Sequence, residues 1–222
     1  MHALQSSNPL IVYLDIKSPY AFIAMEPTLK LQSELGISID WRPLTLDIPS
    51  YLGSARKEGG KVVESNRTPE QWIRIKYAYK DARRYAERQG HMLKGTEKIW
   101  DSSIANIGIL WVMEQNSGLM GSYLRATFPA FWRRELNIEE VAVVEDCLQK
   151  AEVTITGFRD FLQRDGRAKH DALQKQLHPS GIYGVPTYII DREIFFGREH
   201  LPYIRWCLSG RSGDAPDMAY EV

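Results

Sequence analysis

Apolar positions in the first forty residues predict a strand, a helix and a second strand. The segment from Leu10 to Asp15 is apolar except at its end, which is typical of a short buried strand. From Ser18 to Leu35 apolar residues recur at roughly helical spacing, and Gly36 follows where a left-handed residue can end a helix. Ile37–Trp41 alternates between apolar and polar residues, as a second strand does. The pattern therefore predicts a β-α-β unit with parallel strands and a right-handed crossover.

The long middle of the chain predicts mostly helices. Residues 44–67 contain Gly, Pro and Ser without clear periodicity, and we expect a loop with short helical pieces there. Thr68 and Pro69 are typical of a helix start, as the cap and the first helical residue, and this helix is predicted to continue to Gly90. Further helical patterns cover residues 103–116, 123–134, 138–150 and 157–177.

Beyond Gly184 the pattern returns to strands. Residues 185–191 and 193–197 are strand-like on either side of Arg192, so we expect a hairpin. Residues 199–208 predict a last helix. The tail 209–222 has several Gly and Pro breaks and few apolar residues, and we expect it to be mobile.

The order of these elements predicts the fold class. When the helical middle is set aside, the two ends of the chain give a four-stranded mixed sheet with helices on both faces. This arrangement is an α/β, thioredoxin-like fold that is split by a large all-helical insertion. We therefore expect a thioredoxin-like domain formed by residues 10–43 and 184–208, and a helical insertion domain formed by residues 44–183.

Composition narrows the possible functions. Of the 222 residues, 44% are hydrophobic and 25% are charged, as in ordinary globular proteins. Lys plus Arg and Asp plus Glu both number 28, so the net charge does not favour binding to nucleic acid or to an anionic membrane. The amino terminus has neither the basic start nor the long apolar core of a signal peptide. We expect a cytoplasmic protein.

Cysteine and histidine usage favours neither a disulfide nor a metal centre. Cys147 and Cys207 lie far apart, each among helix-forming residues, and we expect both to be buried thiols. The five histidines lack the spacing of zinc ligands, so we expect no metal.

The tetrapeptide Ser18-Pro19-Tyr20-Ala21 stands where the first strand ends and the first helix begins. Ser18 is a good N-cap, and Pro19 suits the first helical position. The free amides and the positive end of the helix dipole favour an anion there. Redox proteins of the thioredoxin type carry a C-x-x-C pair at this place, whereas this tetrapeptide has no sulfur. We infer a site for a thiolate that a ligand brings, with a plain helix cap as the alternative.

The segment Gly184-Val185-Pro186-Thr187 places a proline at the start of a predicted strand. An edge strand tolerates such a proline because its missing donor is not needed there. Alternatively, the Val185–Pro186 bond is cis, and the N–H and C=O of Val185 pair with a bound extended peptide. The local sequence leaves both interpretations open.

Four stretches, in the expected order, resemble one known family. They are Asp15-x-x-Ser18-Pro19-Tyr20-Ala21-Phe22, Ser65-Asn66-Arg67, Asn106-Ile107-Gly108, and Gly184-Val185-Pro186-Thr187 with Phe195-Phe196-Gly197-Arg198-Glu199-His200-Leu201. On these residues the chain, from about residue 10 to residue 208, resembles the 2-hydroxychromene-2-carboxylate isomerases and the kappa-class glutathione transferases. These proteins form part of the DsbA-like branch of the thioredoxin superfamily. The first and last stretches are specific in combination, whereas the middle two are weak alone.

The resemblance implies glutathione as the cofactor. In that family a serine at the position of Ser18 contacts the glutathione sulfur, so Ser18 would donate its hydroxyl proton to the thiolate. Val185, beside Pro186, would pair with the cysteine part of the tripeptide through its backbone. The segment Phe196-Gly197-Arg198-Glu199 matches the one that binds the glutamyl end. The alternatives are that Glu199 only favours the dipole of the following helix and that Arg198 is a solvated charge.

The resemblance also implies a site for an organic acid. Asn66 and Arg67 match the family's substrate-binding pair, and a guanidinium suits a carboxylate. Trp100 lies, by its spacing, where the isomerases carry a substrate-contacting tyrosine. The alternatives are a turn followed by an exposed arginine, and core packing of the indole. The segment before Asn66 is longer than in the isomerases, so Lys57 and Lys61 are both candidates for the family's substrate-binding lysine.

These implications favour a glutathione-dependent isomerase of an unsaturated aromatic or chromene-type carboxylic acid, which acts by reversible thiolate addition to a C=C bond. A kappa-like glutathione S-transferase that conjugates glutathione to electrophiles is the first alternative. A non-catalytic thioredoxin-fold binding module is the second, and in such a module Arg67 and Trp100 would not line a common pocket. A disulfide oxidoreductase is not expected, because no cysteine lies near the helix start. The resemblance also implies a homodimer.

Overall fold

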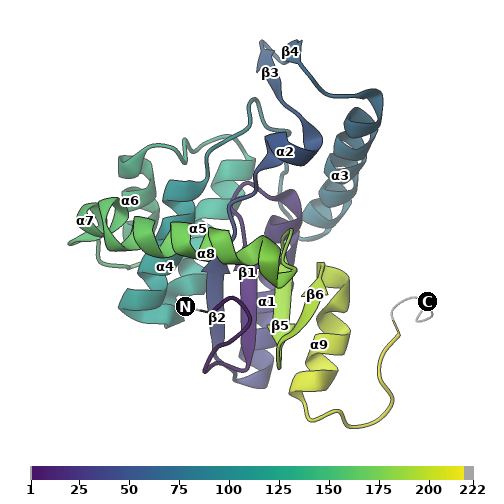
Figure 1. The fold of residues 1–222 in the computed structure, drawn as a ribbon, viewed down its shortest axis with the longest axis vertical. Coiled ribbons are helices and arrows are strands. Elements are labelled where there is room, and N and C mark those ends of the chain that lie inside the picture. The colour runs from purple at the N-terminus through teal and green to yellow at the C-terminus, as the bar shows by residue number, and fades with distance from the viewer. Residues whose placement is uncertain (1, 218–222) are drawn as a thin grey trace.

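The two ends of the chain pair in one sheet. The structure, a computed structural model, describes residues 2–217 and contains a four-stranded sheet of order β2-β1-β5-β6 (Figure 1). β1 (Leu10–Leu14) runs parallel to β2 (Ile39–Pro43) and antiparallel to β5 (Thr187–Ile190). β5 forms a hairpin with β6 (Glu193–Phe196). The predicted thioredoxin-like fold with its mixed sheet is confirmed.

The first helix begins and ends at the residues that the sequence predicts. β1 is apolar because it lies between two other strands, and all five of its residues are buried. α1 (Pro19–Leu35) begins after Ser18, whose side chain accepts a hydrogen bond from the Ala21 N–H, and ends at Gly36 with a φ of 61°. A left-handed φ suits glycine, so the expected helix end is confirmed.

The segment between β2 and β5 is mostly helical, and in Figure 1 most of its helices lie beside and in front of the sheet, with α3 at the upper right. The prediction of one helix over residues 157–177 was wrong. Arg164, with φ of −118° and ψ of −99°, is not helical, so the chain forms two helices there. The helices and 3-10 turns are α2 (Ile48–Leu52), α3 (Pro69–Arg88), α4 (Ser103–Asn116), η1 (Ser117–Leu119), α5 (Met120–Trp132), α6 (Val141–Lys150), α7 (Phe158–Gln163), α8 (Asp165–Leu177) and η2 (His178–Ser180), followed after β6 by η3 (Arg198–His200) and α9 (Leu201–Leu208).

Residues 44–67 differ from the expected loop with short helical pieces. Besides α2, they contain β3 (Ala55–Glu58) and β4 (Lys61–Ser65), which form an antiparallel hairpin at one end of the molecule (Figure 1). Gly59 and Gly60 make its two-residue turn with φ of 55° and 79°, which glycine adopts easily. The insertion is therefore not all-helical. The Gly-Gly pair signals such a turn, but the strands lack an apolar face because all five β4 residues are exposed.

The buried helix α4 contains one glycine whose lack of a side chain is required. A Cβ at Gly108 would stand 2.3 Å from the Tyr123 hydroxyl oxygen. That hydroxyl is fully buried and donates to the carbonyl of Ala105 at 2.8 Å. Gly108 therefore lets α5 pack closely against α4.

The chain after α9 forms neither a helix nor a strand up to Asp217. Trp206 Nε1 donates to the carbonyl of Gly213 at 3.1 Å. Residues 218–222 of the predicted mobile tail lie outside the described residues. Cys147 is a buried free thiol as expected, whereas Cys207, on the outer helix α9, is free but only half-buried.

Residues 2–217 contain neither a membrane-spanning helix nor a cluster of metal ligands. None of their helices is both long and apolar enough to span a bilayer. Among the same residues, no three His, Cys, Asp or Glu side chains gather in a way that could hold a metal ion.

Candidate active site

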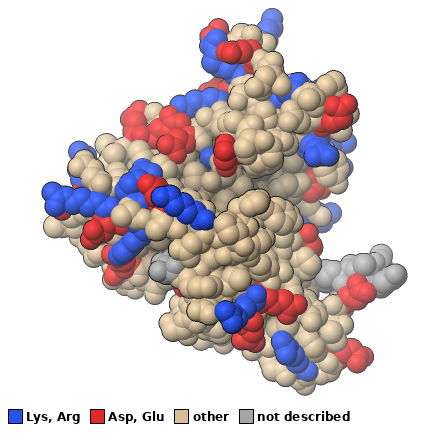
Figure 2. Space-filling model, viewed as in Figure 1, with Lys and Arg blue, Asp and Glu red and all other residues tan. Residues whose placement is uncertain are grey.

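A cavity of about 1310 Å³ opens where the start of α1 meets the hairpin, α3 and the turn before β5. Its lining includes Ser18, Arg67, Trp100, Val185 and Phe196, which come from four distant parts of the sequence. In the space-filling view, charged side chains gather mainly around the margin of the molecule, and much of the middle is uncharged (Figure 2). The fold therefore brings the predicted cofactor residue Ser18 and the predicted substrate residues Arg67 and Trp100 to one cavity.

Ser18 caps α1 and still has a free donor. Its side chain is buried, with 3% of the residue exposed, and its Oγ accepts from the Ala21 N–H at 3.2 Å. Within residues 2–217 the hydroxyl donates no hydrogen bond. Because a hydroxyl can accept and donate at once, the cap leaves the proton available for a ligand in the cavity.

The Val185–Pro186 bond is cis, as one of the two interpretations expected. The alternative of an edge-strand proline was wrong, because Pro186 precedes β5, which lies between β1 and β6. Val185 is buried and lines the cavity, and neither its N–H nor its C=O makes a hydrogen bond within residues 2–217. Buried backbone groups are nearly always paired, so this pair is available to an extended ligand.

Asp15 holds the turn between β1 and α1. Its buried carboxylate accepts hydrogen bonds from Ser102 Oγ at 2.5 Å, Asn106 Nδ2 at 3.1 Å and the Lys17 N–H at 3.2 Å, all on Oδ1. Its other oxygen accepts from the Leu46 N–H at 2.8 Å. These contacts join β1, α4 and the start of the insertion, and they fix the approach to Ser18. Asp15 belongs to the first family motif, but this role was not predicted, although a lone carboxylate directly after an apolar strand was a signal.

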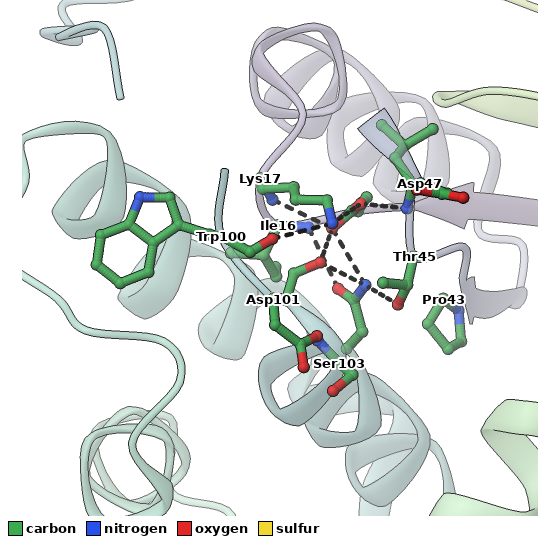
Figure 3. A network of polar contacts seen from close by, with 12 residues as sticks. Ile16, Lys17, Pro43, Thr45, Asp47, Trp100, Asp101 and Ser103 are labelled. Atoms are coloured by element: carbon green, nitrogen blue, oxygen red, sulfur yellow. Dashed lines mark hydrogen bonds and ion pairs between the residues drawn. The ribbon is translucent and has the colours of Figure 1, made fainter. Parts of the chain in front are cut away.

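Asn106 extends the same network, and Figure 3 shows the part of it around Ile16 and Thr45. Its Oδ1 accepts from the Ile16 N–H at 3.2 Å, and its Nδ2 also donates to Thr45 Oγ1 at 2.8 Å. Thr45 Oγ1 lies 2.8 Å from His170 Nε2, and His170 Nδ1 lies 2.8 Å from Asp171 Oδ1. Burial lowers the pKa of His170, although Asp171 opposes the shift. The imidazole is therefore neutral at pH 7, with Thr45 as donor to Nε2 and Nδ1 as donor to Asp171.

Asn66 and Arg67 occupy different positions at the base of the hairpin. Asn66 Oδ1 accepts from the Ser54 N–H at 2.6 Å, so this exposed side chain joins the two ends of the hairpin and does not line the cavity. Arg67 does line the cavity, with its Nε donating to the carbonyl of Gly53 at 3.3 Å and its guanidinium 5.0 Å from the Trp72 ring. The structure therefore brings the arginine, but not the asparagine, to the cavity.

The structure also shows which of the remaining substrate candidates line the cavity. Lys57 lies on β3 and lines the cavity, whereas Lys61 does not. Trp100 lines the cavity and is half-buried, with its ring packed edge-on against Phe131 at 5.8 Å and beneath Lys98 Nζ at 4.4 Å. The indole thus packs on the core and also faces the cavity, so both interpretations of Trp100 hold in part.

The end of β6 and the turn that follows it only border the cavity. Phe196 lines it, but Gly197, Arg198 and Glu199 do not. Gly197 has a φ of 106°, and a Cβ there would stand within 2.4 Å of the Glu199 carboxylate, so glycine is required for this turn. The Arg198 guanidinium lies 3.5 Å from the ring centre of Tyr85. The predicted contacts of these three residues with glutathione stay predictions.

Tyr20 contributes a neutral phenol to the cavity. Burial, and then the nearby Asp81 carboxylate, raise the pKa of Tyr20 to about 12. Its hydroxyl lies 3.5 Å from Asp81 Oδ2, at the limit of a hydrogen bond. At neutral pH this phenol is a hydrogen-bond donor and carries no charge.

Together, the mixed sheet, the capped helix start and the cis-proline turn beside one cavity define a thioredoxin-fold protein whose helix start carries serine in place of cysteine. The chain belongs to the family of DSBA-like thioredoxin domains, whose model matches residues 9–206.

Known proteins similar to this chain include two curated isomerases. The chain is 22% identical over 193 residues to a 2-hydroxychromene-2-carboxylate isomerase of Sphingobium xenophagum, covering 86% of this chain and 93% of that protein. It is 22% identical over 192 residues to a protein of the same name from Pseudomonas putida, covering 85% and 88%.

Solved structures share the fold at low identity. The structure of a 2-hydroxychromene-2-carboxylate isomerase superposes with a TM-score of 0.67 at 18% identity, covering 91% of this chain and 94% of that chain. The cytosolic disulfide reductase DsbM from Pseudomonas aeruginosa, solved with GSH, superposes with a TM-score of 0.52 at 17% identity, covering 84% and 87%.

Proposed function

We propose that this protein is a glutathione-dependent isomerase of an unsaturated aromatic or chromene-type carboxylic acid. The observation that carries the proposal is the shared cavity, in which Ser18 and Val185 lie with Arg67 and Trp100. The names of the two curated relatives support the isomerase class. The common cavity also argues against a binding module that has lost its substrate site.

The cofactor half of the proposal depends on unpaired groups that suit glutathione. Val185 offers a free backbone N–H and C=O for a peptide, and Ser18 offers a hydroxyl proton beside the first turn of α1. A hydrogen bond to a charged group contributes about 1.5–3 kcal/mol, which lowers the pKa of a thiol by about 1–2 units from its usual value of about 8.5. That DsbM, which shares the fold, has been solved with GSH is consistent with this assignment.

The substrate half of the proposal depends on charge. The cavity is lined by seven Lys or Arg side chains but only two carboxylates, those of Asp47 and Glu97. This excess of positive charge favours an organic anion, although the chain as a whole is neutral. Arg67 suits a carboxylate, Lys57 adds a second cation on the hairpin, and the Trp100 ring offers a face for an aromatic substrate.

Glutathione, when bound, supplies a thiolate for reversible addition to the C=C bond of the substrate. Ser18 would hold that sulfur by donating its hydroxyl proton, and Val185 would align the peptide beside it. Arg67 would orient the substrate carboxylate, so that its double bond faces Ser18. The apolar side chains among the lining residues reduce competition from water for these contacts.

Calorimetric titration with glutathione, followed by an assay on 2-hydroxychromene-2-carboxylate, tests the proposal. We expect glutathione to bind and the substrate to isomerise only in its presence, with a product that contains no sulfur. A product that retains sulfur would replace the isomerase with a kappa-like transferase. Absence of glutathione binding would overturn both.

We further propose a cytoplasmic homodimer. A reduced glutathione pool is characteristic of the cytosol, and both cysteines of the chain are free thiols. Analytical ultracentrifugation would show a species of twice the 25.5 kDa chain mass, and a species of single chain mass would contradict the dimer.

A further inference from the structure

Lys17 is a buried cation directly before Ser18. Only 7% of its side chain is exposed, and the residue lines the same cavity as Ser18, Arg67 and Trp100. Its Nζ donates to the carbonyl of Trp100 at 3.1 Å, and Figure 3 shows its side chain reaching into the polar network between α1 and α4. The family motif Asp15-x-x-Ser18 leaves position 17 unspecified, so the resemblance assigns this lysine no role.

The ammonium group of Lys17 does not donate a hydrogen bond to Asp15. The two form an ion pair at 4.0 Å, which is beyond hydrogen-bond distance. The Asp15 carboxylate already accepts bonds from two side chains and two backbone N–H groups. An ammonium has three donors, and within residues 2–217 Lys17 Nζ makes its one hydrogen bond to Trp100. Donors on a buried cation therefore stay available beside the cavity.

The proposed reaction develops negative charge close to this position. Addition of a thiolate forms one S–C bond, while the π pair of the C=C bond moves through conjugation onto the oxygen of an adjacent carbonyl. The former C=C bond is now single, and rotation about it becomes possible. The electron pair then returns from the oxygen, the S–C bond breaks to release the thiolate, and nothing is oxidised or reduced. The oxygen that carries the charge needs a donor that is already in place.

We propose that Lys17 donates a hydrogen bond to this substrate oxygen and so stabilises the charge that forms on it. This proposal rests on the proposed function and narrows the substrate to compounds whose C=C bond is conjugated to a carbonyl. Lys17 would be catalytic at one end of the substrate, and Arg67 would hold the carboxylate at the other. In this arrangement Asp15 keeps Lys17 close to Ser18 without consuming its donors.

The test compares Lys17→Met with Lys30→Met, a matched variant on the exposed side of α1, where the Lys30 side chain is 74% exposed. Loss of one such donor lowers kcat by about 100-fold or more. We expect this loss in K17M, partial recovery in Lys17→Arg and wild-type kcat in K30M. The affinity for glutathione sulfonate, measured by calorimetry, is expected to stay unchanged in all three.

A second readout needs no glutathione and no turnover. 4-Hydroxy-3-nitrobenzoate carries a carboxylate and a nitrophenol oxygen whose ionisation is visible in its absorbance. We expect the wild-type protein and K30M to lower the pKa of the bound nitrophenol by about one unit or more, and K17M to abolish that shift, since one unit corresponds to about a tenfold change in equilibrium.

The outcomes separate the two proposals. A wild-type protein that isomerises its substrate, with K17M changing neither kcat nor the nitrophenol pKa, would overturn the role of Lys17 alone. If K17M lowers only the melting temperature, Lys17 is merely the counter-ion of Asp15, which also overturns it. If K17M does not fold, Lys17→Gln replaces it, with the same loss of kcat expected. A wild-type protein without glutathione binding would overturn the proposed function, whatever the nitrophenol shows.

Discussion

The two walls of the cavity are built in different ways. One wall, here called the sheet wall, consists of residues 15–21 and 184–187, where Asp15 and Ser18 are buried and tied to the core. The other, here called the hairpin wall, consists of residues 48–80 and carries Arg67. All five β4 residues are exposed, and α3 buries only Ala82 and Ala86, which lie beyond that wall.

This difference assigns different tasks to the two walls. Groups that must hold a reacting sulfur within tenths of an ångström belong on the sheet wall, because packing and paired polar groups fix their positions. Groups that choose among substrates can lie on the hairpin wall, where a substitution costs little stability. We infer that the chemistry of the site depends on the sheet wall and its selectivity on the hairpin wall.

The largest expected effect comes from two matched asparagines: Asn106 supports the sheet wall from α4, and Asn66 lies at the base of the hairpin. Asn106→Leu removes the bonds to Asp15 and Thr45 and leaves the buried Ile16 N–H unpaired, so the free energy of unfolding should fall by about 3 kcal/mol or more. Asn66→Leu removes one exposed bond to Ser54, and the loss should stay below about 1 kcal/mol. Urea unfolding at constant m-value measures both. Equal losses would contradict the contrast between the walls.

The next effect concerns the bound sulfur. Ser18→Ala should preserve the fold but raise the pKa of the bound glutathione thiol by about 1–2 units, because a hydrogen bond worth about 1.5–3 kcal/mol to the thiolate is lost. The ultraviolet absorbance of the thiolate in the complex, followed against pH, measures the shift. Ser33→Ala, on the exposed end of the same helix, serves as the control. A thiolate signal that persists unchanged at neutral pH would remove Ser18 from the sulfur site.

A smaller effect is expected from Arg67→Met on the hairpin wall. Loss of the guanidinium should raise KM for the carboxylate substrate about tenfold, which corresponds to about 1.4 kcal/mol. The affinity for glutathione should not change, since Ser18 and Val185 are unaffected. Steady-state kinetics and calorimetry separate the two quantities. A loss of glutathione affinity as large as the change in KM would show that the two walls do not act separately.

The smallest effect is a dependence of stability on pH at the junction of the walls, where His170 contacts Thr45. Burial lowers the pKa of His170 in the folded state, so the unfolded chain binds its proton first as the pH falls below about 6.5. The folded protein should therefore lose stability as the pH falls through that value toward the lowered pKa. His170→Gln should reduce this dependence, measured by urea unfolding between pH 5 and pH 7.5. An unchanged slope would exclude His170 as its source.

Local pattern was sufficient to predict a helix or a strand where one pattern of apolar and polar residues continues along the whole segment. β1 is apolar throughout because it lies inside the sheet, and α1 has both a capping serine and a closing glycine. The hairpin escaped prediction because apolar and polar residues do not alternate along β3 and β4, and every β4 residue is exposed, even though Gly59 and Gly60 mark the turn.

The strand segments, the capped helix start and the residues that resemble a glutathione site could be recognised from local pattern, since each depends on neighbours along the chain. Which of these segments meet depends on the packing of the whole chain. This packing brought Arg67, Lys57 and Trp100 to the cavity beside Ser18, left Asn66 and Lys61 outside it, and buried Lys17 next to Asp15. The physical reason is that a cavity is lined by residues distant in sequence, whose positions depend on how whole helices and strands pack.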